Sequence, residues 1–163
     1  MDKAKDLILE MIHFDAGEPE LIQHFVKVYE FAKLIGLMEG ISPEQMEVLE
    51  AAAVVHDIGI KVCMEKFGEC SGKMQEREGP AYAEELLGRL GFRQELLERV
   101  SYLVAHHHTY SNIDGIDYQI LVEADFLVNF YENQNSKEAI RNTYDKIFKT
   151  ESGRKICSRM FMI

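Results

Sequence analysis

Apolar residues recur at the spacing of an amphipathic helix along almost the whole chain, and this pattern restricts the fold more than any other feature of the sequence. Side chains three and four positions apart share one face of a helix. We expect helices over residues 3–14, 20–38, 43–57, 80–90, 93–108, 117–132, 136–149 and 151–161, with a polar loop over 68–79 and a turn over 112–115. No alternating strand pattern of useful length competes. The sequence therefore predicts an all-α, single-domain helical bundle.

A few residues mark expected helix ends. Ser42 is the expected N-cap of a helix that has Pro43 in its first turn and Gln45 as the capping-box partner. Gly59 is expected to end that helix, and Pro80 is expected to open a later one.

The length and composition fit one domain, residues 1–163. A chain of 163 residues with 47% hydrophobic residues can bury a sizeable core without a second domain. We expect the core to cover about 20–132 and the helices over about 136–161 to pack on it as accessories. A second copy of the chain is the candidate partner for the apolar, Met-rich segment 156–163, which predicts a homodimer.

The net charge of −10 argues against long nucleic acid as a partner, because the surface as a whole repels polyanions. A small phosphorylated substrate remains compatible with this charge, because a metal ion would supply positive charge locally.

The cysteines and the apolar runs point to a cytoplasmic protein that does not enter a membrane. Cys63, Cys70 and Cys157 are odd in number and lack a C-x-x-C spacing, so neither a disulfide framework nor a thiolate zinc site is indicated. No apolar run approaches the roughly 20 residues of a membrane span, and the N-terminus lacks a signal-peptide core.

The His56-Asp57 pair directly follows an apolar run, at a helix end that we expect to be buried. A charged and a titratable side chain there cost free energy unless a partner satisfies them. His24, the triplet 106–108 and Asp125 supply further imidazole and carboxylate groups in apolar helical segments. Alone, His24 would be a hydrogen-bonded core histidine, and Asp125 would cap a helix or pair with a basic side chain. Together with the pair they indicate a metal ion, because one cation satisfies all of these groups.

This order of residues resembles the HD superfamily of metal-dependent phosphohydrolases, which is named for the His-Asp dipeptide. The resemblance covers about residues 20–130. The expected metal ligands are His24, His56, Asp57 and Asp125. Imidazole and carboxylate donors together suit a divalent Mn, Fe, Co, Ni or Zn ion.

We expect a metal-dependent hydrolase of phosphoric esters that acts on a small phosphate ester through a metal-activated water. The resemblance implies that the ester is nucleotide-like and that Asp57 is both a ligand and the group that orients the attacking water. Lys61, just after the expected helix end, is the candidate for contact with a phosphate oxygen, and Arg77 in the polar loop is a second. Tyr110 or Asn112 is the candidate for contact with the leaving group.

The histidine triplet 106–108 bears on whether a second metal binds. In relatives with two metals, further histidines between the pair and the late aspartate hold the second ion. His107 continues the apolar stripe of its helix and is the candidate for this role or for the pocket. The stretch 74–80, where those relatives place another histidine, contains none, and Glu76 or Glu78 is the candidate substitute.

Two other functions stay open on this scaffold. One is a di-iron oxygenase, which needs about six nitrogen and oxygen ligands; the histidine missing from residues 74–80 argues against it. The other is a non-catalytic module that senses a nucleotide or a metal, with partners that dock on the C-terminal helices.

Overall fold

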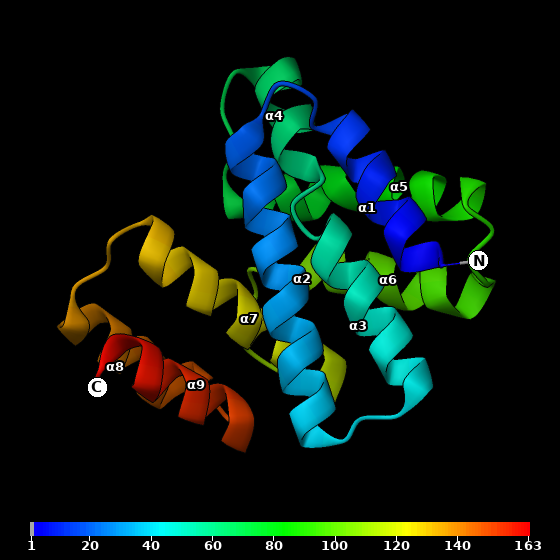
Figure 1. The fold of residues 1–163 in the computed structure, drawn as a ribbon. Coiled ribbons are helices and arrows are strands. Elements are labelled where there is room, and N and C mark those ends of the chain that lie inside the picture. The colour runs from blue at the N-terminus through cyan, green and yellow to red at the C-terminus, as the bar shows by residue number, and fades with distance from the viewer. Residues whose placement is uncertain (1) are drawn as a thin grey trace.

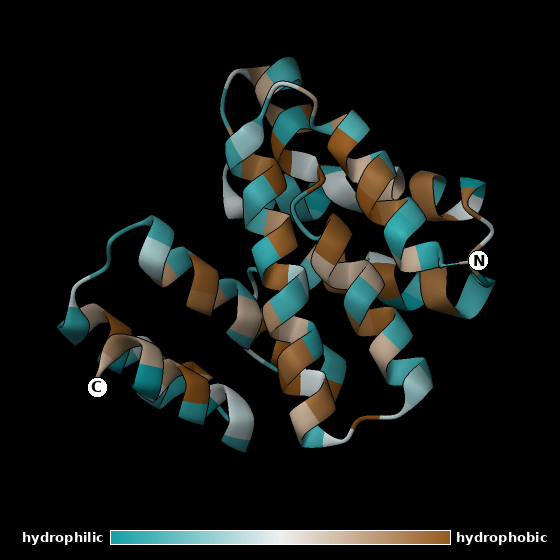
Figure 2. Cartoon of the chain, in the orientation of Figure 1, coloured by the Kyte–Doolittle hydropathy of each residue, from teal (hydrophilic) through white to brown (hydrophobic). Residues whose placement is uncertain are grey.

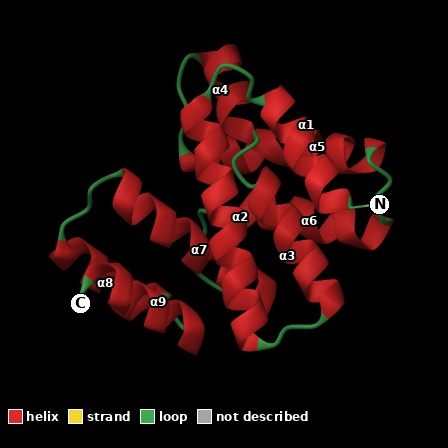
Figure 3. Cartoon of the chain, viewed as in Figure 1, coloured by secondary structure: helices red, strands yellow, loops and turns green. Residues whose placement is uncertain are grey.

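Helices form all the regular structure of residues 2–163, the part of the chain that the computed structural model describes (Figure 3). They are α1 Lys3–Phe14, α2 Pro19–Glu39, α3 Pro43–Val55, α4 Gly59–Phe67, α5 Gly72–Arg89, α6 Gln94–His106, α7 Ile116–Glu132, α8 Lys137–Ile147 and α9 Glu151–Phe161. No strand occurs within these residues. The predicted all-α, single-domain fold is confirmed.

Helix α2 lies at the centre of the bundle, with α3 on one side and α7 on the other (Figure 1). Helices α5 and α6 form an antiparallel pair beside them, and α4 packs on α5. Figure 2 shows apolar and polar residues alternating around individual helices, as amphipathic helices require. The apolar faces meet in one core, in which Phe25, Val28, Leu49, Leu103 and Leu121 are almost completely buried. This burial is the main term that favours the folded bundle.

The capping box at the start of α3 is confirmed. The amide of Gln45 donates to the Ser42 hydroxyl over 3.1 Å, and the Ser42 amide donates to the Gln45 side chain over 2.9 Å. Two of the amides that the first turn leaves unpaired are thereby satisfied.

The end of α3 differs from the prediction. This helix ends at Val55 instead of Asp57, and Gly59 begins α4 instead of ending α3. Gly59 is needed for a close helix crossing, because a Cβ atom there would lie 3.0 Å from the Gln75 carbonyl oxygen. The glycine therefore serves tertiary packing and not a left-handed turn.

The predicted loop over 68–79 is also wrong, because α5 begins at Gly72 and Pro80 lies inside it. The Ser71 hydroxyl accepts a hydrogen bond from the Met74 amide over 3.2 Å and caps the helix. A proline inside a helix removes one backbone hydrogen bond. Packing of α5 against α4 and α6 offsets this loss, with Gly79 and Ala83 buried on the packed face.

The C-terminal helices α8 and α9 form a hairpin that packs on the core through α2 and α7 (Figure 1). A fully buried carboxylate, that of Glu123 in α7, accepts hydrogen bonds from the Thr150 hydroxyl at 2.7 Å and the Thr150 amide at 3.1 Å. In the segment 156–163, Cys157 is buried while Met160 and Met162 are exposed. The homodimer stays a prediction.

No helix in residues 2–163 combines the length and the apolar character that crossing a bilayer requires.

Candidate metal centre

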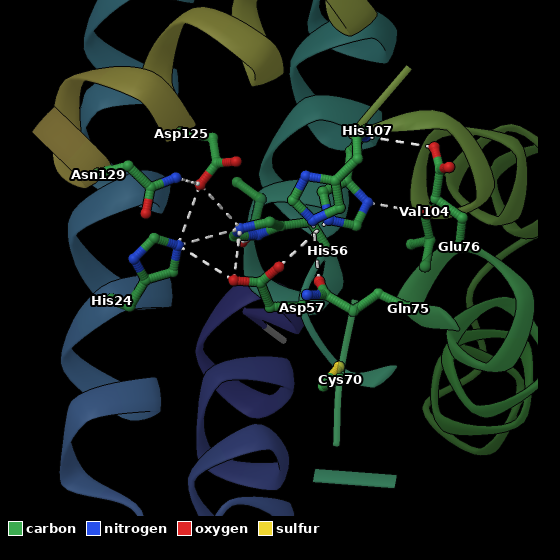
Figure 4. A network of polar contacts seen from close by, with 12 residues as sticks. His24, His56, Asp57, Cys70, Gln75, Glu76, Val104, His107, Asp125 and Asn129 are labelled. Atoms are coloured by element: carbon green, nitrogen blue, oxygen red, sulfur yellow. Dashed lines mark hydrogen bonds and ion pairs between the residues drawn. The ribbon is translucent and has the colours of Figure 1, made fainter. Parts of the chain in front are cut away.

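Two histidines and two aspartates from distant parts of the chain meet between α2, α7 and the turn that joins α3 to α4 (Figure 4). The Nε2 atom of His24 lies 3.0 Å from Asp125 Oδ1, 3.1 Å from Asp57 Oδ2 and 3.3 Å from His56 Nε2. The Nε2 atom of His56 lies 3.3 Å from Asp57 Oδ2 and 3.4 Å from Asp125 Oδ1. Two nitrogen and two oxygen atoms thus face one another at nearly uniform separations.

These separations fit coordination of one ion. Neighbouring donor atoms about 2.0–2.2 Å from a metal lie about 2.8–3.6 Å apart when the angles at the metal are octahedral or tetrahedral. The residues predicted as ligands from the sequence, His24, His56, Asp57 and Asp125, are therefore brought together with the spacing that a bound cation needs.

Each side chain of this cluster is oriented by a neighbour outside it. The Nδ1 atom of His56 bonds to the Ala53 carbonyl at 2.8 Å, and that of His24 lies 2.5 Å from Glu132 Oε1. An acceptor at Nδ1 places the ring proton there and leaves the Nε2 lone pair free for a metal. The amide group of Asn129 donates to Asp125 Oδ1 over 3.0 Å and fixes that carboxylate.

The two carboxylates of the cluster are stabilised by positive charge next to them. Burial by itself would lower the pKa of His24, but hydrogen bonds to Asp125 and Asp57 outweigh it and raise the pKa to about 11. Burial would also lower the pKa of His56. The attraction to Asp57 and a hydrogen bond to Asp125 outweigh this effect and raise the pKa to about 10. Burial raises the pKa of both aspartates, yet the histidines hold these pKa values well below the usual range. Two protons on the imidazoles balance two carboxylates here, and one divalent cation would supply the same charge.

A second group of donors adjoins the first through Asp57. Whereas Asp57 Oδ2 faces His24 and His56, Asp57 Oδ1 lies 3.2 Å from His107 Nε2. The Nδ1 atom of His107 bonds to the Val104 carbonyl at 2.8 Å, which again directs Nε2 inward. Asp57 is therefore placed to bridge two sites.

The three histidines of the triplet point in different directions. His107 is buried in the cluster as expected, while His106 stacks on Tyr102 with ring centroids 4.0 Å apart and lies outside it. His108 joins Asp57 and His107, and its Nε2 atom lies 3.0 Å from Gln75 Oε1. Burial and the nearby His107 lower the pKa of His108 to about 4, so its ring is neutral near pH 7 and able to bind a metal.

Sequence reasoning missed His108 and Gln75. Helical periodicity could not identify them, because α6 ends at His106 and Gln75 lies in a stretch predicted as a loop. Glu76 and Glu78, the candidate substitutes for the histidine missing from residues 74–80, do not join the cluster. Glu76 accepts from the Thr109 hydroxyl at 2.8 Å and the His108 amide at 3.3 Å, and thus holds the chain after α6 in place.

Three of the four residues predicted to contact substrate have partners elsewhere in the fold. The Lys61 ammonium donates to the Phe14 carbonyl over 2.7 Å at the end of α1. Arg77 is 62% exposed, and its guanidinium lies over the Phe67 ring. The Tyr110 ring packs on Phe126, and burial, with the nearby charge of Asp125, raises the pKa of its hydroxyl to about 12. Their roles in substrate binding stay predictions.

A cleft of about 570 Å³ opens beside His24 and Asp57, between the start of α2, the end of α7 and α4. Other residues of its lining include Glu20, Gln23, Ile60, Asn129, Glu132 and Asn133. Among the four proposed ligands, Asp57 has the most exposed side chain at 17%. A small molecule in the cleft would therefore approach the cluster from the side of Asp57.

Comparisons with known proteins agree with this architecture. The family model described as the HD domain matches residues 21–149. The crystal structure of a predicted HD superfamily hydrolase from an uncultured Thermotogales bacterium has the same fold, with a TM-score of 0.67 and 24% sequence identity over 99% of this chain and 85% of that one. No curated protein matches the sequence. Because the family model spans well over half of the residues, the chain belongs to the HD domain family of metal-dependent hydrolases.

Proposed function

We propose that this protein is a phosphohydrolase that uses one divalent transition metal to cleave a small, nucleotide-like phosphate ester. One observation carries the proposal: the Nε2 atoms of His24 and His56 and the carboxylate oxygens of Asp57 and Asp125 are separated as the donors around one ion would be. Family membership supports a metal-dependent hydrolase, and the reaction and substrate are our inference.

The donor set favours Mn, Fe, Co, Ni or Zn over Mg or Ca, because half of its donors are imidazole nitrogens. Such an ion, when bound, lowers the pKa of a coordinated water and polarises a phosphoryl oxygen. The ligands would be His24, His56, Asp57 and Asp125. His24, His56 and Asp125 are buried, and hydrogen bonds fix His56 and Asp125, so little reorganisation of these ligands should accompany metal binding.

The protein's own groups would position the reactants. Asp57 borders the cleft and presents one carboxylate oxygen to each group of donors, which supports our assignment of the attacking water to it. The Tyr110 hydroxyl is neutral near pH 7 and can donate a hydrogen bond to the leaving oxygen. Lys61 would have to exchange its bond to the Phe14 carbonyl for one to a phosphate oxygen.

The second candidate function is a di-iron oxygenase, which would need a centre that binds two metals. The second donor group favours it, because Asp57, His107 and His108 adjoin the first site and raise the number of contributing residues to six. Oxygen consumption by the iron-loaded protein, without release of phosphate, would support this function over hydrolysis.

Metal reconstitution tests the proposed function. The purified protein is stripped with a chelator, reloaded with Mn, Fe, Co, Ni or Zn, and assayed on phosphomonoesters and phosphodiesters, with metal content measured by elemental analysis. We expect phosphate release with at least one metal, and its loss in His24→Ala and Asp57→Asn. His106→Ala is the matched control, because this histidine stacks on Tyr102 outside the cluster. Folded protein that stays inactive with every metal would refute the proposal.

A further inference from the structure

We propose that the leaving alcohol of the substrate carries no negative charge, because the cleft beside His24 and Asp57 is acidic and repels a second anionic group. This inference rests on the proposed function. It narrows the substrate to a phosphate ester of a neutral or cationic alcohol and disfavours polyphosphates and bisphosphates.

The lining of the cleft is poor in positive charge. Glu20 and Glu132 contribute carboxylates, and no lysine or arginine belongs to the lining formed by the described residues. Glu132 is already paired, since its two oxygens contact His24 Nδ1 and the Lys27 ammonium, the latter at 2.6 Å. Lys27 is therefore engaged with Glu132, whereas Glu20 forms no ion pair with the residues that the structure describes.

The groove next to the cleft is also acidic. It shares Glu20 and Ile60 with the cleft and adds Glu18 and Glu65. Its one basic residue, Lys61, directs its ammonium to the Phe14 carbonyl. A leaving group that extends from the metal centre into this groove meets three glutamates and one engaged lysine.

Uncharged polar groups of a substrate would find partners in the cleft. Gln23 and Asn133 offer amide donors and acceptors, and Asn129 keeps its carbonyl oxygen after its amide nitrogen donates to Asp125. Leu21 and Ile60 supply apolar contact. A metal ion would balance the transferred phosphate, whereas nothing in this lining would balance a further anion. Several carboxylates within about 10 Å of such an anion would weaken its binding by about tenfold at low salt.

A set of small phosphomonoesters that differ in the charge of the leaving alcohol tests the inference. We would compare phosphoethanolamine, glycerol 3-phosphate and 3-phosphoglycerate, whose alcohols are cationic, neutral and anionic. We expect kcat/KM for the anionic substrate to be about tenfold lower than for the neutral one, mainly through KM. This difference should shrink as the salt concentration rises, because the repulsion is screened. Comparable binding and turnover of 3-phosphoglycerate and glycerol 3-phosphate at low salt would overturn the inference.

Glu20→Gln tests which charge is responsible. We expect it to raise the ratio of kcat/KM for 3-phosphoglycerate to that for glycerol 3-phosphate by about threefold, with a larger effect in Glu20→Lys. Glu84→Gln, on an exposed face of α5 outside the cleft, is the matched control and should change neither value. Equal changes in kcat/KM for 3-phosphoglycerate in Glu20→Gln and Glu84→Gln would show that the repulsion does not come from the charge in the cleft.

Calorimetry separates this inference from the proposed function. Binding of the same three phosphates to the metal-loaded protein is measured whether or not they are hydrolysed. Absence of turnover with every metal refutes the proposed function. A binding order in which 3-phosphoglycerate equals or exceeds glycerol 3-phosphate refutes the charge selection by itself.

Discussion

Glu132 Oε1 lies 2.5 Å from Nδ1 of His24, on the side of the ring opposite the metal centre. A carboxylate behind a metal-binding imidazole fixes the tautomer and increases the basicity of the ligand nitrogen. The Lys27 ammonium in turn holds Glu132 from the solvent side. The end of α7 thus orients a ligand that α2 supplies.

Removing this support should weaken metal binding. We expect Glu132→Gln, which keeps an acceptor but loses the charge, to lower metal affinity about tenfold, and Glu132→Ala to lower it about 100-fold. Competition with a chromogenic chelator measures both affinities, and Glu84→Gln serves as the control for loss of an exposed carboxylate. Wild-type affinity in Glu132→Ala would show that His24 needs no partner at Nδ1.

Asp15 should make stability depend on pH. Its carboxyl is 3% exposed, and Oδ1 has no hydrogen-bond partner within residues 2–163. Burial raises its pKa from 3.8 to about 6, although Lys61 opposes the shift. The folded state therefore binds this proton more tightly than the unfolded state, and the stability it contributes below pH 3.8 is lost as the pH rises through about 6.

Asp15→Asn removes this titration. We expect the variant to exceed the wild type in free energy of unfolding by about 2 kcal/mol at pH 7.5 and to match it near pH 3.5. Urea denaturation at a series of pH values measures the difference, and Asp145→Asn, an exposed site on α8, should give no such trend. A constant difference between Asp15→Asn and wild type across this range would rule out the burial effect.

The helix crossing at Gly59 should not accept a methyl group. A Cβ atom at this position would lie 3.0 Å from the Gln75 carbonyl oxygen and 3.2 Å from the Gly79 amide nitrogen, both of which are backbone atoms. We expect Gly59→Ala to lower the free energy of unfolding by about 2 kcal/mol. Gly88→Ala, in α5 with only Leu97 of α6 nearby at 3.8 Å, should raise it by about 0.5 kcal/mol. Equal effects of the two substitutions in urea denaturation would contradict the crossing geometry.

The anchor of the C-terminal hairpin should be sensitive to loss of a single carboxylate. Glu123 accepts hydrogen bonds from the Gln119 side chain at 2.6 Å and the Lys149 amide at 3.1 Å, besides those from Thr150. We expect Glu123→Ala to lower the free energy of unfolding by about 3 kcal/mol, because several buried donors lose their acceptor. Thr150→Ala, which removes the N-cap of α9 and one hydrogen bond to Glu123 but keeps the carboxylate, should cost less, about 2 kcal/mol. A wild-type rate of hydrogen exchange in α9 of Glu123→Ala would show that Glu123 does not hold the C-terminal hairpin on the core.

The sequence predicted the helical fold from local patterns, and it indicated the four proposed ligands through polar residues in apolar helical segments and the resemblance to the HD superfamily. His24 and Asp125 each fall on a buried stripe, and a buried polar group on such a stripe needs a partner wherever the helix packs. The predictions around α4 and α5 were wrong for a tertiary reason. Glycine and proline there favour a loop locally, and only the packing of α5 on its neighbours makes a helix the better solution. The sequence did not predict His108, because this residue follows the end of α6 and its position is set by tertiary contacts with Gln75 and Glu76.

The most direct test of the metal centre is an anomalous difference map from crystals of the metal-loaded protein, recorded at the absorption edge of the bound metal. We expect one strong peak about 2.0–2.2 Å from the Nε2 atoms of His24 and His56 and from carboxylate oxygens of Asp57 and Asp125. Crystals of protein that binds the metal in solution but shows the peak elsewhere, with these four side chains uncoordinated, would contradict the proposed centre.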